Sequence, residues 1–452
     1  MNIIIAGDGK VGAALVHQLS SEGYNITIID TNAAVLENSS SRYDVICVEG
    51  NCASMGILQQ AGVMDAELLI AATSQDEINL LCCTTAHAMN PKLHTIARIR
   101  NPEYTDQIYK MHHVFGLSLA VNPEKQAAEE IARLIKYPGF LRRDVFAKGR
   151  TEIVELRIED NSKLRDVTLI EMSGIVKCRV LVCAVLRNGV AQVPGGHFRL
   201  RAGDRIFVTA PRENLTILLK NLGIIPKKAR NVMMVGGGRV SFYLAQQLAQ
   251  EHIDAKIIEL DPERCRELAE FLPDTDIIHG DGSDMELLES EGLSEADSLV
   301  TTTGMDEQNM IMSLFGTTTG VRQVITKVDH VENRGILDSL KLGSIICPKD
   351  LCTNTIIRYV RAMQNQHGAA VSVHAIADGQ VEAMEFIVDD SIPYCGIALK
   401  ELKVKPGVLI ATITRGPRTA IANGSSVFQK GDTIVAVTTG RGLIRQLSDI
   451  FA

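Results

Sequence analysis

Residues 1–12 of the chain read MNIIIAGDGKVG, and residues 230–241 read RNVMMVGGGRVS. In the first stretch, GDGKVG is a G-x-G-x-x-G motif that directly follows a strand-like apolar run and opens an amphipathic helical run, Val11–Leu19. In that context the first glycine permits a tight turn, the second lets the backbone approach a pyrophosphate, and the third allows close packing of helix and strand. The free N–H groups at the start of the helix attract phosphates. The motif predicts a dinucleotide site formed by Gly7, Asp8, Gly9, Lys10 and Val11.

An acidic residue stands where such a site needs one. Asp30 ends the next apolar run, 23 residues after Gly7. A carboxylate there can accept hydrogen bonds from both ribose hydroxyls, and each charge-assisted bond contributes roughly 1.5–3 kcal/mol. This preference for a free 2′-hydroxyl favours NAD over NADP. The alternative is that Gly7 and Asp30 merely serve a turn and a solvated strand end.

The second stretch predicts a second site. Its motif is GGGRVS, and Glu259 follows the first glycine of the motif by 23 residues, as Asp30 does in the first copy. Ser241 replaces the third glycine, so either the affinity and ligand differ at this site or the copy is degenerate and kept as a scaffold. The residues predicted to bind here are Gly236, Gly237, Gly238, Arg239, Val240 and Glu259.

These two stretches belong to a repeat that runs through the whole chain. Gly7 and Gly236 are 229 residues apart, and the same offset relates Asp30 to Glu259 and Arg98 to Lys327. An offset of 230 relates Gly50-Asn51 to Gly280-Asp281 and residues 76–79 (DEIN) to residues 306–309 (DEQN). Landmarks that keep register this well indicate a duplicated unit of about 230 residues.

The first part of each repeat alternates short apolar runs with helical stretches. In the first repeat these runs are Ile3–Ala6, Asn25–Ile29, Val45–Val48, Leu68–Ala72, Thr95–Ile99 and Ser118–Val121. Alternation of this kind implies right-handed crossovers and a parallel, doubly wound sheet. The fold class is therefore α/β, with two Rossmann-type domains.

The second part of each repeat changes character and predicts a small α+β module. In the first module a strand is expected over Cys178–Leu186, and Asn188-Gly189 is a strong signal for a two-residue hairpin turn. A second strand is expected over Ile206–Thr209, with its counterpart over Ile434–Val437. The predicted domains are residues 1–138, 150–225, 230–362 and 370–452, with a linker between the repeats at residues 223–230.

Further candidate ligands follow the fourth and fifth strands of each repeat. Arg98 and Lys327 follow the fifth strands, near the crevice where nucleotides bind in such sheets, and a cation there can neutralise a phosphate. The alternative is a salt bridge to a neighbouring carboxylate. Thr73-Ser74 and Thr303 end the fourth strands, where they either line the adenine side or simply cap the strand end.

Composition excludes several classes of function. The formal net charge is −8 and no dense run of Lys and Arg occurs, which argues against nucleic acid as a partner. The ten Cys form no C-x-x-C pair, no leader-like segment precedes the first strand, and no run of ~18 apolar residues occurs, so we expect a cytosolic protein. The sequence contains no G-x-x-x-x-G-K-[ST], H-E-x-x-H or G-x-S-x-G motif, and we expect neither a catalytic residue nor a metal site.

The same residues carry a family resemblance over essentially the whole chain. The matching stretches are residues 7–12, Asp30, residues 72–79 (ATSQDEIN), residues 97–104 (ARIRNPEY), residues 235–241, Glu259, residues 279–284 (HGDGSD) and residues 303–309 (TGMDEQN). In these features the chain resembles the Trk-type potassium uptake regulators of the TrkA family. Members of that family are tandems of two RCK (KTN) units, each followed by a small C-terminal module.

The resemblance implies a regulatory function without catalysis. It implies a protein peripheral to the cytoplasmic face of the cell membrane, bound to an integral-membrane potassium-translocating subunit and assembled as a homo-oligomeric ring. NAD(H) and ATP or ADP would bind in the N-terminal lobes, at the residues predicted above and, in the second repeat, also at His279. Ligand binding would reorient lobes joined by residues 138–150 and 361–370. Two other interpretations remain open: an NAD-dependent oxidoreductase acting on a small substrate, and a scaffold whose pockets bind nothing.

Overall fold

The computed structural model describes residues 1–136, 139–224, 229–329, 340, 342–363, 370–390, 392–439, 444 and 446–451. Three predicted features lie partly outside these residues: the connection at 138–150 through its residue 138, the linker at 223–230 through its residues 225–228, and the connection at 361–370 through its residues 364–369. Among the helices that are described, none has both the length and the apolar character needed to cross a membrane.

The first repeat begins with a six-stranded sheet in the order β3-β2-β1-β4-β5-β6, in which every pair of neighbours is parallel. Its strands are β1 (Asn2–Ala6), β2 (Asn25–Asp30), β3 (Ile46–Glu49), β4 (Leu68–Ala71), β5 (His94–Arg98) and β6 (Leu119–Val121). This is the predicted doubly wound sheet. The strand order reverses between β1 and β4, and ligands of such sheets bind in the crevice at the carboxyl ends of strands that flank this reversal.

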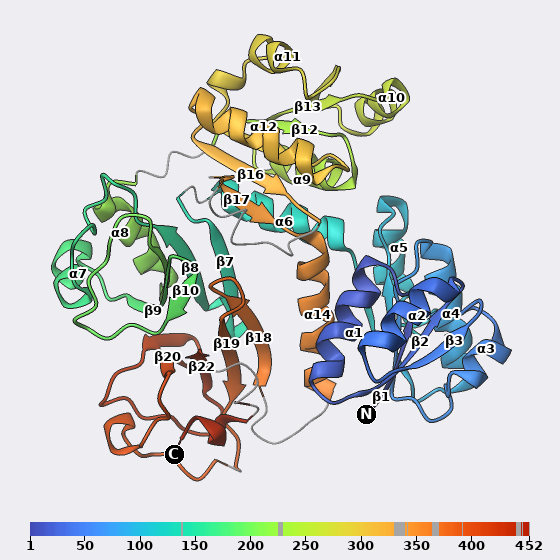
Figure 1. The fold of residues 1–452 in the computed structure, drawn as a ribbon, viewed down its shortest axis with the longest axis horizontal. Coiled ribbons are helices and arrows are strands. Elements are labelled where there is room, and N and C mark those ends of the chain that lie inside the picture. Colours follow the sequence, from blue (N-terminus) through green and yellow to red (C-terminus); the bar gives the residue numbers. More distant parts are fainter. Residues whose placement is uncertain are drawn as a thin grey trace. The chain divides into compact units, whose positions relative to one another are not determined.

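Helices connect these strands and gather around the sheet, as Figure 1 shows in blue and cyan. They are α1 (Lys10–Ser21), α2 (Ala33–Arg42), α3 (Met55–Gln60), α4 (Asp76–Met89) and α5 (Pro102–Met111). Helix α6 (Pro123–Lys136) follows β6, the last strand of this sheet. Local sequence explains where several of them begin. The side chain of Asn32 accepts the backbone N–H of Ala34 at the start of α2, and Asn101 caps α5, whose first residue is proline.

The second repeat builds the same sheet, in the order β14-β13-β12-β15-β16-β17. Its strands are β12 (Asn231–Val235), β13 (Asp254–Glu259), β14 (Thr275–His279), β15 (Ser298–Thr301), β16 (Gln323–Lys327) and β17 (Ser344–Ile346). Its described helices are α9 (Arg239–Gln250), α10 (Pro262–Phe271), α11 (Met285–Ser290), α12 (Asp306–Thr319) and α14 (Pro348–Met363). The predicted duplication of the Rossmann-type fold is confirmed strand by strand.

Each repeat ends in a five-stranded antiparallel sheet, in the orders β10-β9-β11-β8-β7 and β18-β19-β22-β20-β21. The first comprises β7 (Arg142–Phe146), β8 (Thr151–Arg157), β9 (Leu181–Arg187), β10 (Val190–Gln192) and β11 (Arg205–Pro211), with α7 (Leu169–Val176) and α8 (Arg212–Leu222). The second comprises β18 (Ala370–Ile376), β19 (Val381–Ile387), β20 (Val408–Arg415), β21 (Arg418–Ile421) and β22 (Thr433–Thr438). Strand β7 lies before residue 150, at which the first module was predicted to begin.

The predicted hairpin in the first module is present, but the strand before it is shorter than expected. Asn188 and Gly189 both have positive φ, at 50° and 74°, and they join the antiparallel strands β9 and β10. The prediction of a strand from Cys178 was wrong at its start, because β9 begins at Leu181. Helix α7 ends in a left-handed residue, Lys177, and the chain needs the next three residues to leave the helix.

The chain divides into two compact units. The first unit consists of Met1–Glu129, Gly238–Leu244 and Cys347–Val360, and the second consists of Glu130–Gly237, Ala245–Ile346 and Arg361–Ala452. Both antiparallel sheets therefore lie in the second unit. There they share one buried core to which both contribute, with Phe146 and Phe207 from the first sheet and Ile376 and Val437 from the second.

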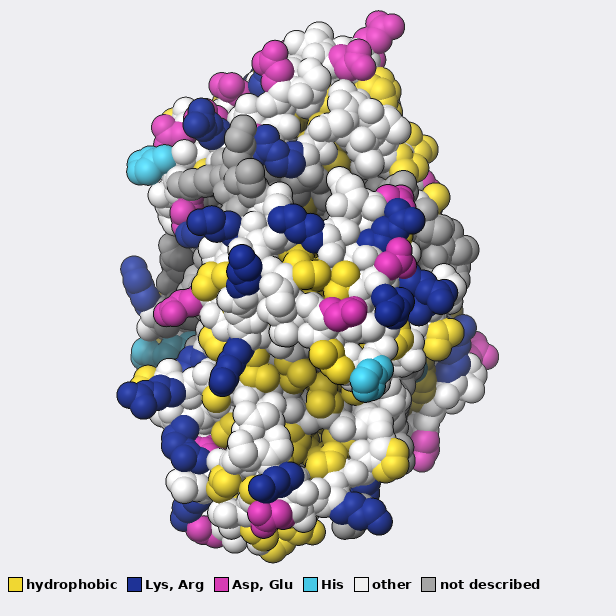
Figure 2. All heavy atoms as spheres, turned by 90° about the vertical axis from the view of Figure 1, so that its left-hand side faces the viewer, with side chains coloured by type: hydrophobic (Ala, Val, Ile, Leu, Met, Phe, Trp, Pro, Cys, Tyr) yellow, Lys and Arg dark blue, Asp and Glu magenta, His cyan; other side chains and the backbone are white. Residues whose placement is uncertain are grey.

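The face of the molecule in Figure 2 shows apolar side chains gathered in its lower half, between Lys and Arg side chains. In the small modules the large apolar side chains that remain exposed are Ile170, Val190, Ile217, Ile387 and Ile397. Apolar atoms contribute more than half of an ordinary soluble protein surface. These exposed side chains therefore assign no partner by themselves.

A buried ionic cluster contributes to the second unit. One oxygen of Asp144 lies 3.0 Å from the Arg142 guanidinium and 3.0 Å from Nδ1 of His374. Burial alone would raise the pKa of Asp144, but Arg142 and His374 outweigh it and hold the pKa at about 2. Because the folded pKa lies below the unfolded value of about 4, this carboxylate stabilises the fold above that unfolded value.

Replacing Asp144 by Asn should lower the free energy of unfolding by about 2.5 kcal/mol at neutral pH. The difference from the wild type should shrink as the pH falls from about 4 towards 2, because the wild-type carboxylate then becomes protonated as well. Urea titrations of the full chain at pH 7 and at pH 3 measure both effects. Asp160→Asn is the control, since that side chain is 92% exposed. Equal stability of wild type and Asp144→Asn at pH 7 would contradict the assignment.

Candidate functional site

The first glycine-rich loop connects β1 to α1 and cannot carry side chains at two of its glycines. Gly7 has a φ of +96°, and a Cβ built on it would lie 2.8 Å from the backbone nitrogen of Thr73. A Cβ on Gly12 would lie 1.9 Å from the carbonyl oxygen of Gly7. The first and third glycines of the motif therefore allow the turn and the close packing predicted for them.

Asp30 holds this loop from the end of β2. Its Oδ2 accepts the backbone N–H of Asp8 at 2.7 Å, and its Oδ1 accepts that of Asn32 at 2.9 Å. A carboxylate has about four lone-pair sites, so both oxygens retain acceptor capacity for a ligand. The predicted association of the first glycine turn with Asp30 is thus present in the structure, and the carboxylate is fixed in place by its two backbone partners.

Asp8 is buried, although the motif leaves the residue type at this position free. Its side chain is 3% exposed, and its Oδ2 accepts the hydroxyl of Ser39 on α2 at 2.5 Å. Its Oδ1 is buried without a hydrogen-bond partner. Burial raises the pKa of Asp8 and the nearby charge of Asp30 adds to the increase, while the Ser39 hydrogen bond opposes it. Ser39 was not predicted, since no pattern links residues 8 and 39.

The second glycine-rich loop repeats the clamp with a longer acid. Gly236 has a φ of +98°, and a Cβ on it would lie 3.0 Å from the backbone nitrogen of Thr303. Oε2 of Glu259 accepts the N–H of Gly237, and its Oε1 accepts that of Asp261 at 2.8 Å. Glu259 therefore occupies the place that Asp30 has in the first repeat.

The residues that follow this loop start helix α9, and its first turn belongs to the first unit. Gly238 has room for a Cβ, Arg239 is exposed and Val240 is buried. Ser241, which replaces the third glycine of the motif, is fully buried. Helix α9 thus accommodates the serine, whereas α1 has no room for a Cβ at Gly12, which packs against the first loop.

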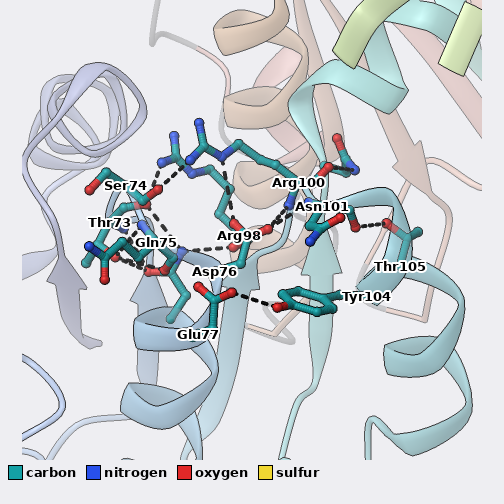
Figure 3. A network of polar contacts seen from close by, with 12 residues as sticks. Thr73, Ser74, Gln75, Asp76, Glu77, Arg98, Arg100, Asn101, Tyr104 and Thr105 are labelled. Atoms are coloured by element: carbon teal, nitrogen blue, oxygen red, sulfur yellow. Dashed lines mark hydrogen bonds and ion pairs between the residues drawn. The ribbon is translucent and has the colours of Figure 1, made fainter. Parts of the chain in front are cut away.

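The side chain of Asn79 joins the ends of β4 and β5. Figure 3 shows Thr73 and Arg98, which lie at these two strand ends. Its Oδ1 accepts both the backbone N–H and the hydroxyl of Thr73, at 2.8 and 2.7 Å. Its Nδ2 donates to the carbonyls of Thr73 and Arg98, at 3.3 and 2.8 Å. Asn79 is fully buried, so these four bonds join two strand ends inside the protein.

Two guanidinium groups lie close together beside this network. Arg98 donates from Nη2 to the carbonyl of Thr73, and Arg100 donates from Nη2 to the carbonyl of Ser74. Burial lowers the pKa of Arg98, and the charge of Arg100 lowers it further. Asp76 accepts the backbone N–H groups of Arg100 and Asn101, both at 2.7 Å.

Neither arginine is fully engaged by these contacts. Nε of Arg98 is buried without a partner, and Nε of Arg100 lies 3.7 Å from Oδ1 of Asp76. The carboxylate partner considered for Arg98 is therefore replaced by a backbone carbonyl. Arg100 was not predicted, although its position two residues after Arg98, past the end of the same strand, could have indicated it.

The second repeat has an equivalent asparagine, but an acidic side chain lies beside its cation. Asn309 accepts the N–H and hydroxyl of Thr303 at 2.9 and 2.8 Å and donates to the carbonyls of Thr303 and Lys327, both at 3.1 Å. Nζ of Lys327 donates to Thr303 and lies 3.3 Å from Oδ1 of Asp329. The predicted alternative for Lys327, a neighbouring carboxylate, is what the structure contains. Asp329 stands at the position of Arg100 in the first repeat.

His279 ends β14 beside Glu259, with which it pairs in the sheet. Its Nε2 lies 3.1 Å from the carbonyl oxygen of Leu260, so the ring is held next to the acid. Within the described part of the chain, no group of three His, Cys, Asp or Glu side chains is placed to hold a metal ion. Both crevices bring together a glycine turn before a helix and a fixed carboxylate, and the first repeat adds two guanidinium groups.

Known families match both parts of each repeat. The model of the TrkA-N domain matches residues 3–123 and 232–348, and the model of the TrkA-C domain matches residues 153–223 and 383–452. These matches cover most of the chain, and they divide it in the same order twice.

Relatives of full length are similar along the whole chain. A protein of Archaeoglobus fulgidus named "Trk system potassium uptake protein TrkA homolog" is 30% identical over 435 residues, with 96% of each chain covered. A protein of Haemophilus influenzae named "Trk system potassium uptake protein TrkA" is 29% identical over 462 residues, covering 100% of this chain and 98% of its own.

Solved structures share the fold at lower identity. The structure described as "GsuK channel bound to NAD" has a TM-score of 0.61 and 15% identity, covering 97% of this chain and 77% of that chain. A structure of GsuK bound to ADP has a TM-score of 0.51 and 13% identity, covering 80% of this chain and 69% of that chain. At such identities the likeness establishes the fold alone.

Proposed function

We propose that this chain, which belongs to the TrkA family of Trk potassium uptake proteins, is a regulatory subunit that binds adenine nucleotides and controls potassium transport by a membrane partner. The observation that carries the proposal is the repeated clamp. In each repeat a carboxylate at the end of the second strand accepts a backbone N–H of the glycine turn.

In the first crevice the adenosine ribose would donate both hydroxyls to Asp30. The phosphates would lie against Gly7, Gly9 and the first turn of α1, with Asp8, Lys10 and Val11 completing the loop. A Cβ built on Gly9 meets no atom within 4 Å, so the space above that glycine is open to a ligand. Arg98 and Arg100 would supply positive charge, and Thr73 and Ser74 would line the base side. NAD(H), ATP and ADP all carry the adenosine diphosphate that this arrangement suits.

In the second crevice Glu259 would hold the ribose and Gly236, Gly237 and Gly238 would face the phosphates. The remaining predicted ligands are Arg239, Val240, His279, Thr303 and Lys327. Because Asp329 partly neutralises Lys327, this crevice offers less positive charge at the end of its fifth strand than the first does. We therefore expect the two crevices to differ in their preference among nucleotides.

The partner would be an integral-membrane potassium-translocating subunit. Support comes from the relatives, which are named as potassium uptake proteins, and from the channel whose nucleotide-bound structures share this fold. We extend the same family properties to this chain: a homo-oligomeric ring on the inner face of the cell membrane. A ligand can reorient the lobes only through different affinities for the two arrangements, and couplings of about 1–3 kcal/mol correspond to effects of about 5–150-fold.

Titration of the full chain with NADH, ATP and ADP tests the proposal, together with potassium uptake by cells that express it. Asp30→Asn and Glu259→Gln keep the shape of each acid but remove its charge. Each should weaken binding at its own crevice by roughly 30-fold or more, because two charge-assisted bonds to the ribose become neutral ones. The double variant should also lose nucleotide control of uptake.

Asp44→Asn is the matched control, an exposed acid near the start of β3. It should bind and regulate like the wild type. Consumption of NADH in the presence of a small substrate would instead favour an oxidoreductase. Wild-type binding and uptake in the Asp30→Asn, Glu259→Gln double variant would refute the assignment of both crevices.

A further inference from the structure

The two crevices differ at one buried position in a way that provides an internal comparison. Asp8 of the first loop corresponds to Gly237 of the second, and Ser39 on α2 corresponds to Leu268 on α10, both at an offset of 229. The first crevice therefore has a second carboxylate beneath the ribose-binding acid, hydrogen-bonded to a serine. In the second crevice a Cβ on Gly237 would lie 2.5 Å from Leu268 and 2.9 Å from Glu259. No acid fits there unless these side chains move.

Asp8 is poorly satisfied as an anion. Its carboxylate is 3% exposed, and one of its two oxygens has no hydrogen-bond partner. A buried carboxylate that lacks donors is costly in its charged form. The neighbouring Asp30 accepts two backbone N–H groups, and in the proposed complex it would also accept two ribose hydroxyls.

The groups around Asp8 come from four elements. On β2, Asp30 is the charged neighbour whose field opposes ionisation of Asp8. On β3 the thiol of Cys47 feels the charge of Asp8, which raises the pKa of that thiol after the larger effect of burial. On α2, Ser39 donates its hydroxyl, and the loop's own Lys10 at the start of α1 is exposed. Two carboxylates that share one site rarely both remain ionised when water leaves it.

We infer that the first crevice takes up a proton when it binds a nucleotide, that Asp8 holds this proton, and that the second crevice does not. The inference rests on the proposed function, because it requires a nucleotide in the first crevice. The bound ribose covers Asp30 and removes water from the pair, and one negative charge is then retained on Asp30. The proton comes from solvent and ends on the Asp8 carboxyl, and no covalent bond other than that O–H bond forms or breaks.

The direction of the pH dependence follows from this assignment. Burial and Asp30 already raise the pKa of Asp8 in the free chain, and the covering ligand raises it further. The complex therefore binds more protons than the free chain between these two pKa values. Across that window, affinity at the first crevice should fall about tenfold for each unit by which the pH rises, and it should be flat on either side.

Calorimetric titration of NADH into the full chain, in buffers of different ionisation enthalpy, measures the number of protons taken up. Glu259→Ala should remove binding at the second crevice, so that the first is measured alone. Asp30→Ala should remove binding at the first crevice, so that the second is measured alone. We expect up to one proton per NADH at the first crevice and none at the second. Asp8→Asn should abolish the uptake, because an amide cannot take up this proton.

A second variant keeps the inference testable if Asp8→Asn does not fold. Ser39→Ala removes the hydrogen bond that favours ionised Asp8, so the window of proton uptake should move to higher pH. Three results would overturn the inference and leave the proposed function intact. They are NADH binding at the first crevice without proton uptake, proton uptake that persists in Asp8→Asn, and a window of uptake that does not move in Ser39→Ala. If NADH bound neither to the Glu259→Ala variant nor to the Asp30→Ala variant, the proposed function itself would be refuted.

Discussion

Gly7→Ala is expected to eliminate nucleotide binding at the first crevice and to destabilise the first repeat by about 2–5 kcal/mol. An alanine there must adopt a φ of +96°, which costs about 1–2 kcal/mol for a residue with a Cβ. Its Cβ would also lie 2.8 Å from the nitrogen and 2.9 Å from the Cα of Thr73, and relieving that contact adds about 1–3 kcal/mol. Thermal unfolding and NADH titration of the full chain measure the two effects.

Substitutions at two other glycines distinguish an effect on folding from an effect on ligand binding. Gly9→Ala should fold normally, since a Cβ there meets no atom within 4 Å, and yet it should lose affinity because its methyl group occupies the space of the pyrophosphate. Gly56→Ala in α3 should change neither property, because its Cβ would meet only Ser54, at 3.9 Å. Wild-type binding by Gly7→Ala would show that the turn does not hold the ligand.

Asn79→Ala should destabilise the first repeat by about 3–5 kcal/mol and loosen the arginine pair at the mouth of its crevice. The substitution removes four hydrogen bonds and leaves buried groups of Thr73 and Arg98 without partners, at a cost of about 1–3 kcal/mol for each unsatisfied group. Hydrogen exchange of the β4 and β5 amides in the full chain should accelerate. Asn309→Ala should do the same to β15 and β16, because its four bonds are equivalent.

Asn38→Ala is the control for this pair of substitutions. Asn38 is exposed on α2, and surface changes of this kind usually stay within about 0.5 kcal/mol. If Asn79→Ala were as stable as Asn38→Ala, the asparagine would not organise the strand ends. The stretches DEIN and DEQN, which the sequence offers only as landmarks of the repeat, would then have no structural role at this position.

Local patterns in the sequence were sufficient to predict the fold and the pairing of each glycine turn with its acid. The turn at Gly7 and the acid at Asp30 are recognisable because each lies at the end of an apolar strand, and parallel strands that end at one edge bring such residues together. The same reasoning placed Glu259 beside the second turn. The hairpin at Asn188-Gly189 was predictable because few residues tolerate two successive positive φ angles.

Contacts between distant segments were not predictable in the same way. The pair of Asp8 and Ser39 depends on how α2 lies over the first loop, which no spacing rule fixes. The hydrogen bonds of Asn79 depend on one side chain that reaches the ends of two strands, β4 and β5. The start of β9 at Leu181 depends on where α7 stops, and a left-handed lysine made that later than the apolar pattern suggests.

In the proposed function, two glycine turns, each clamped by a carboxylate, bind adenine nucleotides without transforming them. Equilibrium dialysis of the full chain against NADH, followed by chemical analysis of the recovered ligand, tests it most directly. We expect two bound NADH per chain at saturation, one in Asp30→Ala and one in Glu259→Ala, all recovered unchanged. No bound NADH, or NADH recovered in oxidised form at a rate that these substitutions reduce, would contradict it.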